Sequence, residues 1–129
     1  MSRRMSCSMT IDAVRSRRKT VTRRSLLTWS TLAAGDRLTL VERGMGLRRG
    51  ERQVVLAEVE VVSVRLEPLL AGLSHGEIRK EGINKHMTPH EWAHWWADAH
   101  GVGGGDLGTV WCRRIEWVYL DEQKQEVSK

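Results

Sequence analysis

Residues 53–65 read QVVLAEVEVVSVR and carry the clearest strand pattern of the chain. Successive side chains of an extended strand point to opposite faces. One face would be apolar and the other acidic, with Val55, Ala57, Val59 and Val61 on the first and Glu58 and Glu60 on the second. The pattern predicts one long strand that ends at Pro68. Its length favours a bent strand that crosses a small barrel.

Weaker patterns on both sides of this strand complete a single domain. Further strands are expected at residues 7–11, 19–24, 37–42 and 109–120, with short helices after Asp12, after Ser74 and at 88–100. For a chain of 129 residues, these elements predict an α+β fold, a small mixed β-barrel with two or three short helices. We expect the domain to span residues 9–120, between a flexible basic leader at 1–8 and a charged tail at 121–129.

Two capping boxes mark helix starts in the second half of the chain. They read Ser74-His-Gly-Glu77 and Thr88-Pro-His-Glu91, and in each the acidic side chain would bond back to the start of its helix. The helical period then places Trp92, Trp95 and Trp96 on one side, where we expect them in the core. A base-stacking role is left to one of the three other tryptophans, which are Trp29, Trp111 and Trp117.

The charge of the chain is unevenly distributed. The sequence has a net charge of +5, yet residues 1–24 alone hold eight basic residues and one acidic residue. Such a segment attracts polyanions by electrostatic steering and counterion release. An apolar fraction of 40% is ordinary for a globular protein. No apolar stretch approaches the ~20 residues of a membrane helix, so we expect no membrane partner.

Cysteines and histidines give no metal-site pattern. Cys7 and Cys112 lie far apart and neither belongs to a CxxC pair, so we expect a cytoplasmic protein without a disulfide. His90 and His94 share one helix face at a spacing of four residues. A structural zinc site needs four ligands, and the sequence supplies no obvious remainder. We therefore expect no metal and no cofactor.

Residues 17–24 read RRKTVTRR and are the most informative stretch for function. The surrounding arginines repel a protonated Lys19, which would lower the pKa of its amine. A neutral lysine can act as a general base toward a hydroxyl such as that of Thr22. Residues three apart on a strand point to opposite faces, so the two can meet only if Lys19 lies in the turn before the strand, or if the strand bulges. The alternative is a basic edge strand whose threonines merely favour extended backbone.

The order of these motifs resembles the ASCH domain, a PUA-like β-barrel family related to RNA-binding modules. The resemblance rests on Arg-Lys-Thr-Val-Thr-Arg-Arg, Gly35-Asp36, the long strand, Glu81-Gly82, the Thr88-Pro-His-Glu-Trp helix and the closing strand. One bacterial branch of the family is an amidohydrolase that removes the acetyl group from N(4)-acetylcytidine. The resemblance implies that Thr22 is its nucleophile, Lys19 the base and Glu81 the group that orients Lys19 or relays a proton. The family usually has glycine where this chain has Arg17, a position for which we expect a positive φ.

Three functions follow as hypotheses from these observations. The first is a PUA-like module that binds single-stranded RNA or DNA, or a modified nucleoside, in a basic cleft. The phosphate contacts would come from Arg17, Arg18, Arg23 and Arg24. The second is the amidohydrolase, acting on N(4)-acylated cytidine. The third is a small protein-interaction domain of bacteriophage type, found in the host cytoplasm.

Overall fold

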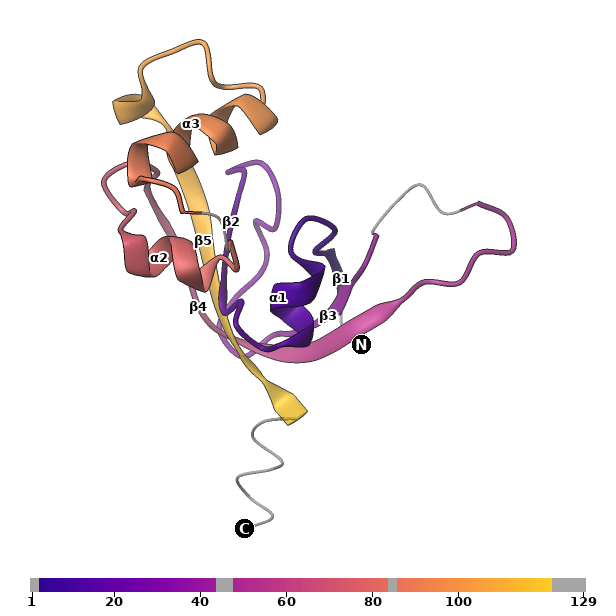
Figure 1. Ribbon diagram of the computed structural model, residues 1–129. Helices are drawn as coiled ribbons and strands as arrows, with labels where there is room; N and C mark the ends of the chain where they lie inside the picture. Colours follow the sequence, from indigo (N-terminus) through magenta and orange to yellow (C-terminus); the bar gives the residue numbers. More distant parts are fainter. Residues whose placement is uncertain (1–2, 44–47, 84–85, 122–129) are drawn as a thin grey trace.

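The computed structural model describes residues 3–43, 48–83 and 86–121 (Figure 1). Within these ranges five strands form one mixed sheet, in the order β1-β3-β4-β5-β2. The strands are β1 (Arg3–Ser6), β2 (Val21–Arg24), β3 (Arg37–Val41), β4 (Val55–Pro68) and β5 (Trp111–Tyr119). The helices are α1 (Ile11–Arg15), α2 (His75–Lys80), α3 (Pro89–Ala99) and the short 3-10 helix η1 (Leu107–Thr109). The predicted α+β class is confirmed, and the sheet is curled into a half-barrel with β1 and β2 at its edges.

β4 is the long central strand that the sequence pattern predicts. It pairs antiparallel with β3 on one side and with β5 on the other, with a register shift between Val61 and Ser63. Ala57, Val59 and Val61 are buried as expected. Val55 is 53% exposed, because it lies where β4 enters the hairpin that projects from the body of the protein (Figure 1).

The two predicted capping boxes have different outcomes. Thr88 forms the complete box with Glu91, and Pro89 occupies the first turn of α3. Ser74 accepts a hydrogen bond from the Glu77 backbone, but the Glu77 carboxylate is directed to Arg114 instead of returning to the helix start. Only half of the Ser74 capping box therefore forms.

The buried face of α3 is displaced from the predicted one. Its buried residues are Trp92, Ala93, Trp96 and Ala97, which pack against α2 and the adjoining part of the sheet. Trp95 is 36% exposed, so the expectation of three core tryptophans is wrong at this position. Alanines on the helix permit close packing on that side, and this turns Trp95 toward the surface.

The amino-terminal segment is part of the sheet, which corrects the expectation of a flexible leader. β1 pairs parallel with β3, and the Met5 side chain is fully buried. The strand expected at residues 7–11 is absent there, since α1 begins at Ile11. Thr10 holds the cap position and Asp12 lies inside the first turn. Of the predicted charged tail, residues 122–129 lie outside the described part of the chain.

Two apolar clusters make up the core. One fills the inside of the curled sheet, around Leu38, Leu40 and Trp117. The other lies between β4, β5 and the helices α2 and α3, around Leu69 and Trp92. Cys7 belongs to the first cluster and Cys112 to the second, and both are free thiols. In the described ranges no helix is long and apolar enough to cross a membrane.

Candidate functional site

A cavity of about 300 Å³ lies where the two edge strands of the sheet approach each other. Its wall is formed by β2, by the segment after β1 and by α3. Arg24 spans the gap between the edges, because its Nη2 donates to the Ser6 carbonyl at 2.8 Å. Lys19, Thr22 and Glu81 all line this cavity, so the three residues predicted to act together share one concavity.

Lys19 lies in the turn before β2, which is one of the two arrangements that would allow the predicted pairing with Thr22. The backbone amides of Arg18 and Lys19 both donate to the Ala13 carbonyl, at 2.8 and 3.1 Å. Arg17 precedes them with a φ of 64°, as expected for a position where the ASCH pattern has glycine. Non-glycine residues adopt this conformation at a cost of roughly 1–2 kcal/mol.

A tight contact between two backbone segments brings Glu81 to Lys19. Gly82 has a φ of 90°, and a Cβ built there would lie 2.6 Å from the Ala13 Cβ. Glycine thus permits the approach by having no side chain. As a result Lys19 Nζ donates to the Glu81 carbonyl at 2.7 Å and lies 3.4 Å from the Glu81 carboxylate Oε1.

Burial lowers the pKa of the Lys19 amine, and the Glu81 carboxylate opposes that shift. Charge repulsion from Arg24 adds to the lowering but is a smaller contribution. The sequence argument therefore had the right direction and the wrong main cause, because desolvation outweighs repulsion between like charges here.

Thr22 is the third of these residues in the cavity lining. It is 4% exposed, and its Oγ1 accepts a hydrogen bond from Arg24 Nε at 3.1 Å. In the described part of the chain no hydrogen bond joins Lys19 Nζ to Thr22 Oγ1. The structure thus links Lys19 to Glu81 directly and places Thr22 beside them on the same cavity.

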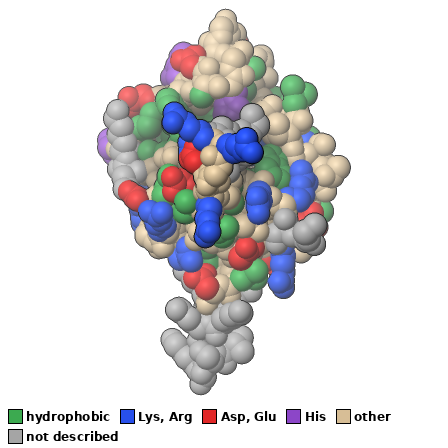
Figure 2. Space-filling view, turned by 90° about the vertical axis from the view of Figure 1, so that its right-hand side faces the viewer, with side chains coloured by type: hydrophobic (Ala, Val, Ile, Leu, Met, Phe, Trp, Pro, Cys, Tyr) green, Lys and Arg blue, Asp and Glu red, His purple; other side chains and the backbone are tan. Residues whose placement is uncertain are grey.

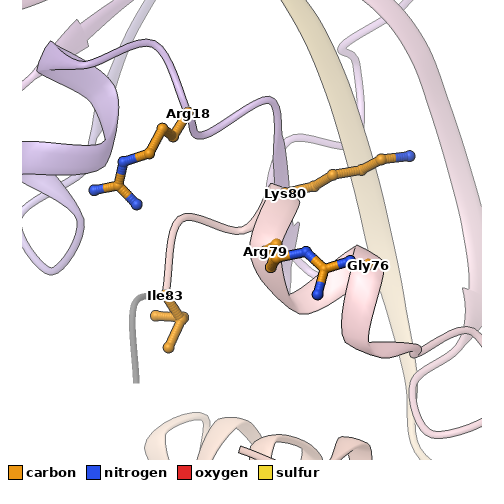
Figure 3. Close-up of a pocket in the computed structure, with 5 residues that line it drawn as sticks. All are labelled: Arg18, Gly76, Arg79, Lys80 and Ile83. Atoms are coloured by element: carbon orange, nitrogen blue, oxygen red, sulfur yellow. The ribbon is translucent and has the colours of Figure 1, made fainter. Parts of the chain in front are cut away.

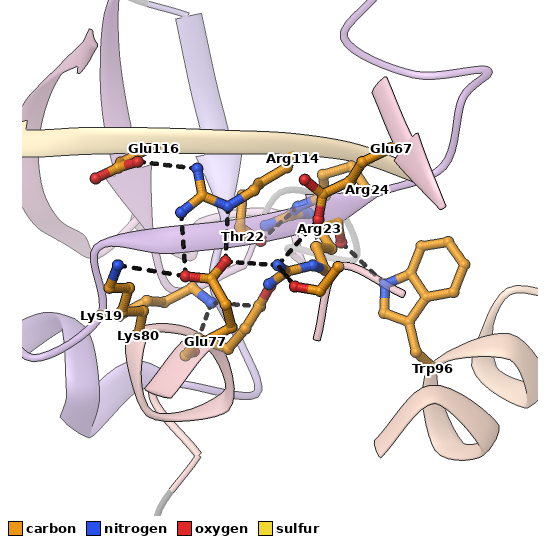
Figure 4. Close-up of polar contacts among 12 residues, drawn as sticks. Lys19, Thr22, Arg23, Arg24, Glu67, Glu77, Lys80, Trp96, Arg114 and Glu116 are labelled. Atoms are coloured by element: carbon orange, nitrogen blue, oxygen red, sulfur yellow. Dashed lines mark hydrogen bonds and ion pairs between the residues drawn. The ribbon is translucent and has the colours of Figure 1, made fainter. Parts of the chain in front are cut away.

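The charge of Arg23 is paired with carboxylates, which does not fit its predicted role in phosphate binding. Its side chain is 0% exposed. Its guanidinium lies among three carboxylates, Glu67 at 3.2 Å, Glu77 at 2.6 Å and Glu81 at 3.0 Å. Figure 4 shows the first two of these beside Arg23. The Trp96 indole N–H also donates to the Arg23 carbonyl, at 3.0 Å. Arg23 therefore joins Glu81, α2 and β4 beneath the cavity.

The other three predicted arginines lie in three different places. Arg17 pairs with Asp121 at 2.8 Å and lies over the Tyr119 ring, away from the cavity lining. Arg18 lines a separate groove on the surface. Of the four, Arg24 is the one whose charged group lies at the cavity without a carboxylate partner in the described chain.

Hydrogen bonds from arginine hold Glu77 in its charged form. Burial alone would raise the pKa of this carboxyl, but the bonds from Arg114 and Arg23 outweigh it and lower the pKa to about 2. A lowered pKa stabilises the fold above the unfolded value of about 4.3, and this contribution is lost as the pH falls toward 2.

We expect the free energy of unfolding to decrease between about pH 5 and pH 2, with part of that decrease due to Glu77. Urea unfolding at pH 7, 5, 4 and 3 measures it. The Glu77→Gln variant should be less stable at pH 7 and should lose less stability over the acid interval. An equal loss in both proteins would contradict the assignment.

The tryptophans of the cavity are those of α3 rather than the three candidates from the sequence. Trp92, Trp95 and Trp96 line it, whereas Trp117 lies in the core and Trp29 stacks under Arg3. Trp111 is exposed and lies elsewhere. The helical spacing of Trp92, Trp95 and Trp96 was the sequence signal for this wall. Trp92 and Trp96 are buried and Trp95 is partly exposed, and all three line the cavity.

Two buried hydrogen-bond donors of cavity-lining residues have no partner in the described chain. They are Trp92 Nε1 and Arg23 Nε. Buried donors in proteins are almost always satisfied, so each such group requires an explanation. Both atoms are closed to solvent, so the open cavity does not expose them.

The remaining polar lining comes from segments that the sequence did not indicate. Cys7 lines the cavity, and burial raises the pKa of its thiol although Lys19 and Arg24 act in the opposite direction. His100 also lines it, stacked on Trp96 with the ring centroids 3.8 Å apart. Among the described residues no cluster of three or more histidine, cysteine or acidic side chains could hold a metal ion.

The chain is thus a small α+β protein with a cavity at the edge of a curled sheet. Comparison with known sequences gives no matching family model and no matching curated protein. Among solved structures the chain is similar to protein EF3133 from Enterococcus faecalis V583, of family DUF984, with a TM-score of 0.63. The match covers 93% of this chain and 80% of that one at 15% identity, so the likeness concerns the fold alone.

Proposed function

We propose that the cavity binds a single nucleobase, carried by a modified nucleoside or nucleotide. The observation that carries the proposal is the lining itself. Buried Lys19, Thr22 and Glu81 share one cavity with the tryptophans of α3. The ASCH-like motif at residues 17–24 supports the same class of ligand, with N(4)-acetylcytidine as the probe that the resemblance implies.

The size and chemistry of the cavity suit one base. Small-molecule sites occupy roughly 300–1,000 Å³, so a cavity of about 300 Å³ fits a base or nucleoside and not a longer strand. A base offers flat faces for aromatic stacking and ring carbonyls for buried donors. Trp95 at the rim offers a ring for stacking, and Lys19 and Arg24 are donors that line the cavity.

The distribution of charge favours recognition of a base over tracking of a nucleic-acid backbone inside the cavity. Arg23 is neutralised by carboxylates and Arg17 lies elsewhere. On the face shown in Figure 2, Lys and Arg side chains are interspersed with Asp and Glu side chains, and no uniformly basic strip runs across it. The base that enters the cavity could therefore belong to a nucleic acid, whose backbone would stay outside the cavity.

Replacing Trp95 with alanine is expected to weaken binding of N(4)-acetylcytidine about 5- to 150-fold, because stacking on an aromatic side chain is worth about 1–3 kcal/mol per base. Trp95 is suitable because it is 36% exposed, so the fold should tolerate its loss. Isothermal titration calorimetry measures the dissociation constants.

Trp111→Ala is the matched control, since Trp111 is another exposed tryptophan and does not line the cavity. It should bind as the wild type does. Equal weakening in both variants, or no binding of the nucleoside to the wild type at millimolar concentration, would refute the proposal.

A second candidate function is hydrolysis of the N(4)-acetyl amide, favoured by the lowered pKa of Lys19 beside Thr22. In this reaction the Thr22 oxygen attacks the acetyl carbonyl carbon while neutral Lys19 takes the hydroxyl proton. The C–N bond breaks as the Lys19 ammonium returns that proton to the leaving amine, so cytidine departs and the acetyl group stays on Thr22. Water then hydrolyses the ester and releases acetate.

Two neighbouring groups would assist this chemistry. Arg24 Nε, which donates to Thr22 Oγ1, would favour loss of the Thr22 hydroxyl proton. Glu81 orients the Lys19 amine through its carbonyl and carboxylate. Lys19 and Thr22 would have to move into hydrogen-bond contact in the substrate complex.

A further inference from the structure

A cationic groove of about 620 Å³ lies beside the cavity (Figure 3). Its described lining residues are Arg18, Gly76, Arg79, Lys80 and Ile83. Three of these five are basic and none is acidic. The groove therefore concentrates positive charge next to a site that has the character of a base pocket.

The groove and the cavity share a wall. Ile83 lines both of them. Two segments also contribute to both sites. In the segment before β2, Arg18 lines the groove and Lys19 the cavity. At the end of α2, Lys80 lines the groove and Glu81 the cavity. The segments are held together by the Thr20 amide, which donates to the Lys80 carbonyl at 2.9 Å. A ligand that extends past Ile83 would reach from one site to the other.

Arg18 and Arg79 are the groups of the groove suited to an anion. The Lys80 ammonium lies 3.3 Å from the Glu77 carboxylate. Arg18 Nε donates to the Ser16 hydroxyl at 2.9 Å. Arg18 and Arg79 are exposed, one in the turn before β2 and the other on α2, with Ile83 lying below them in Figure 3. Guanidinium groups match the geometry of phosphate oxygens, and a solvent-exposed guanidinium can approach a ligand without unfolding its surroundings.

We propose that this groove binds the phosphate of a nucleotide whose base occupies the cavity. The inference rests on the proposed function and narrows it. The ligand is a phosphate-bearing nucleotide, free or within a strand, and not a free nucleoside. Arg18 and Arg79 contact the phosphate, while Trp95 and the polar residues that line the cavity contact the base.

Calorimetry at low salt tests this with N(4)-acetylcytidine, its 5′- and 3′-monophosphates and a short single-stranded oligonucleotide containing the same base. The better of the two monophosphates should bind the wild type about tenfold more tightly than the nucleoside. Arg79→Gln and Arg18→Gln should reduce that advantage to about threefold or less and leave the affinity for the nucleoside unchanged. Arg15→Gln, an exposed arginine of α1 outside the groove, should keep the full advantage.

The ligands and variants of this experiment test the groove separately from the base site, and distinguish a free nucleotide from a nucleic-acid strand. If the nucleoside binds and a phosphate adds nothing, or if the Arg15 control loses the advantage equally, the groove assignment is overturned and the base site stands. If neither nucleoside nor nucleotide binds, both proposals are overturned. Tighter binding of the oligonucleotide than of the monophosphates supports a phosphate within a nucleic-acid strand, and equal binding supports a free nucleotide.

Discussion

Replacing Arg23 with methionine is expected to lower the free energy of unfolding by about 3–5 kcal/mol, the range for removing one partner of a buried ion pair. The side chain is fully buried and contacts three carboxylates, Glu67 on β4, Glu77 on α2 and Glu81 directly after α2. Without Arg23, the three carboxylates would lose their shared cationic partner in a buried site. Urea unfolding at pH 7 measures the difference.

The matched control is Arg15→Met, which removes an arginine from an exposed ion pair. Arg15 lies 3.8 Å from Glu42, with more than half of its side chain accessible. Exposed pairs contribute about 0–1 kcal/mol, so this variant should be nearly as stable as the wild type. Similar losses in both variants would show that the buried network does not hold the site together.

Replacing Lys19 with methionine is expected to reduce hydrolysis of N(4)-acetylcytidine about 10²- to 10⁴-fold, the usual contribution of a general base. Replacing Thr22 with valine should abolish it, because the attacking oxygen is removed and the volume is kept. Chromatography of the released cytidine over time measures both rates.

Thr39→Val controls for the loss of a buried threonine elsewhere. Thr39 is 9% exposed on β3 and bonds to Glu58 instead of lining the cavity. It should keep the wild-type rate. Hydrolysis that persists in the Thr22 variant would refute the nucleophile assignment, and an inert wild type would leave nucleobase binding as the function.

Local sequence patterns predicted the elements whose burial follows a simple period. The alternation in residues 53–65 identified β4, and the capping box at Thr88 located the start of α3. Of the two arrangements that would let Lys19 meet Thr22, the structure has the turn before the strand, although no hydrogen bond joins the two side chains in the described residues. These features depend on residues close together in the chain.

Features that depend on distant partners could not be predicted in the same way. Arg23 reads as one more exposed cation, because the carboxylates that bury it lie 44 to 58 positions later. The amino-terminal residues read as a leader because their strand is formed only by pairing with β3. Trp95 differs from Trp92 and Trp96 only through what α3 packs against.

Amide and indole chemical-shift mapping during titration with N(4)-acetylcytidine 5′-monophosphate is the most direct measurement of where a base sits. The largest shifts should fall on Cys7, Thr22 and the Trp92 and Trp95 indoles, with smaller ones at Arg79. Shifts gathered instead around the exposed Arg43–Glu51 pair of the projecting hairpin, or none at saturating ligand, would mean that the hollow beside α3 is no binding site.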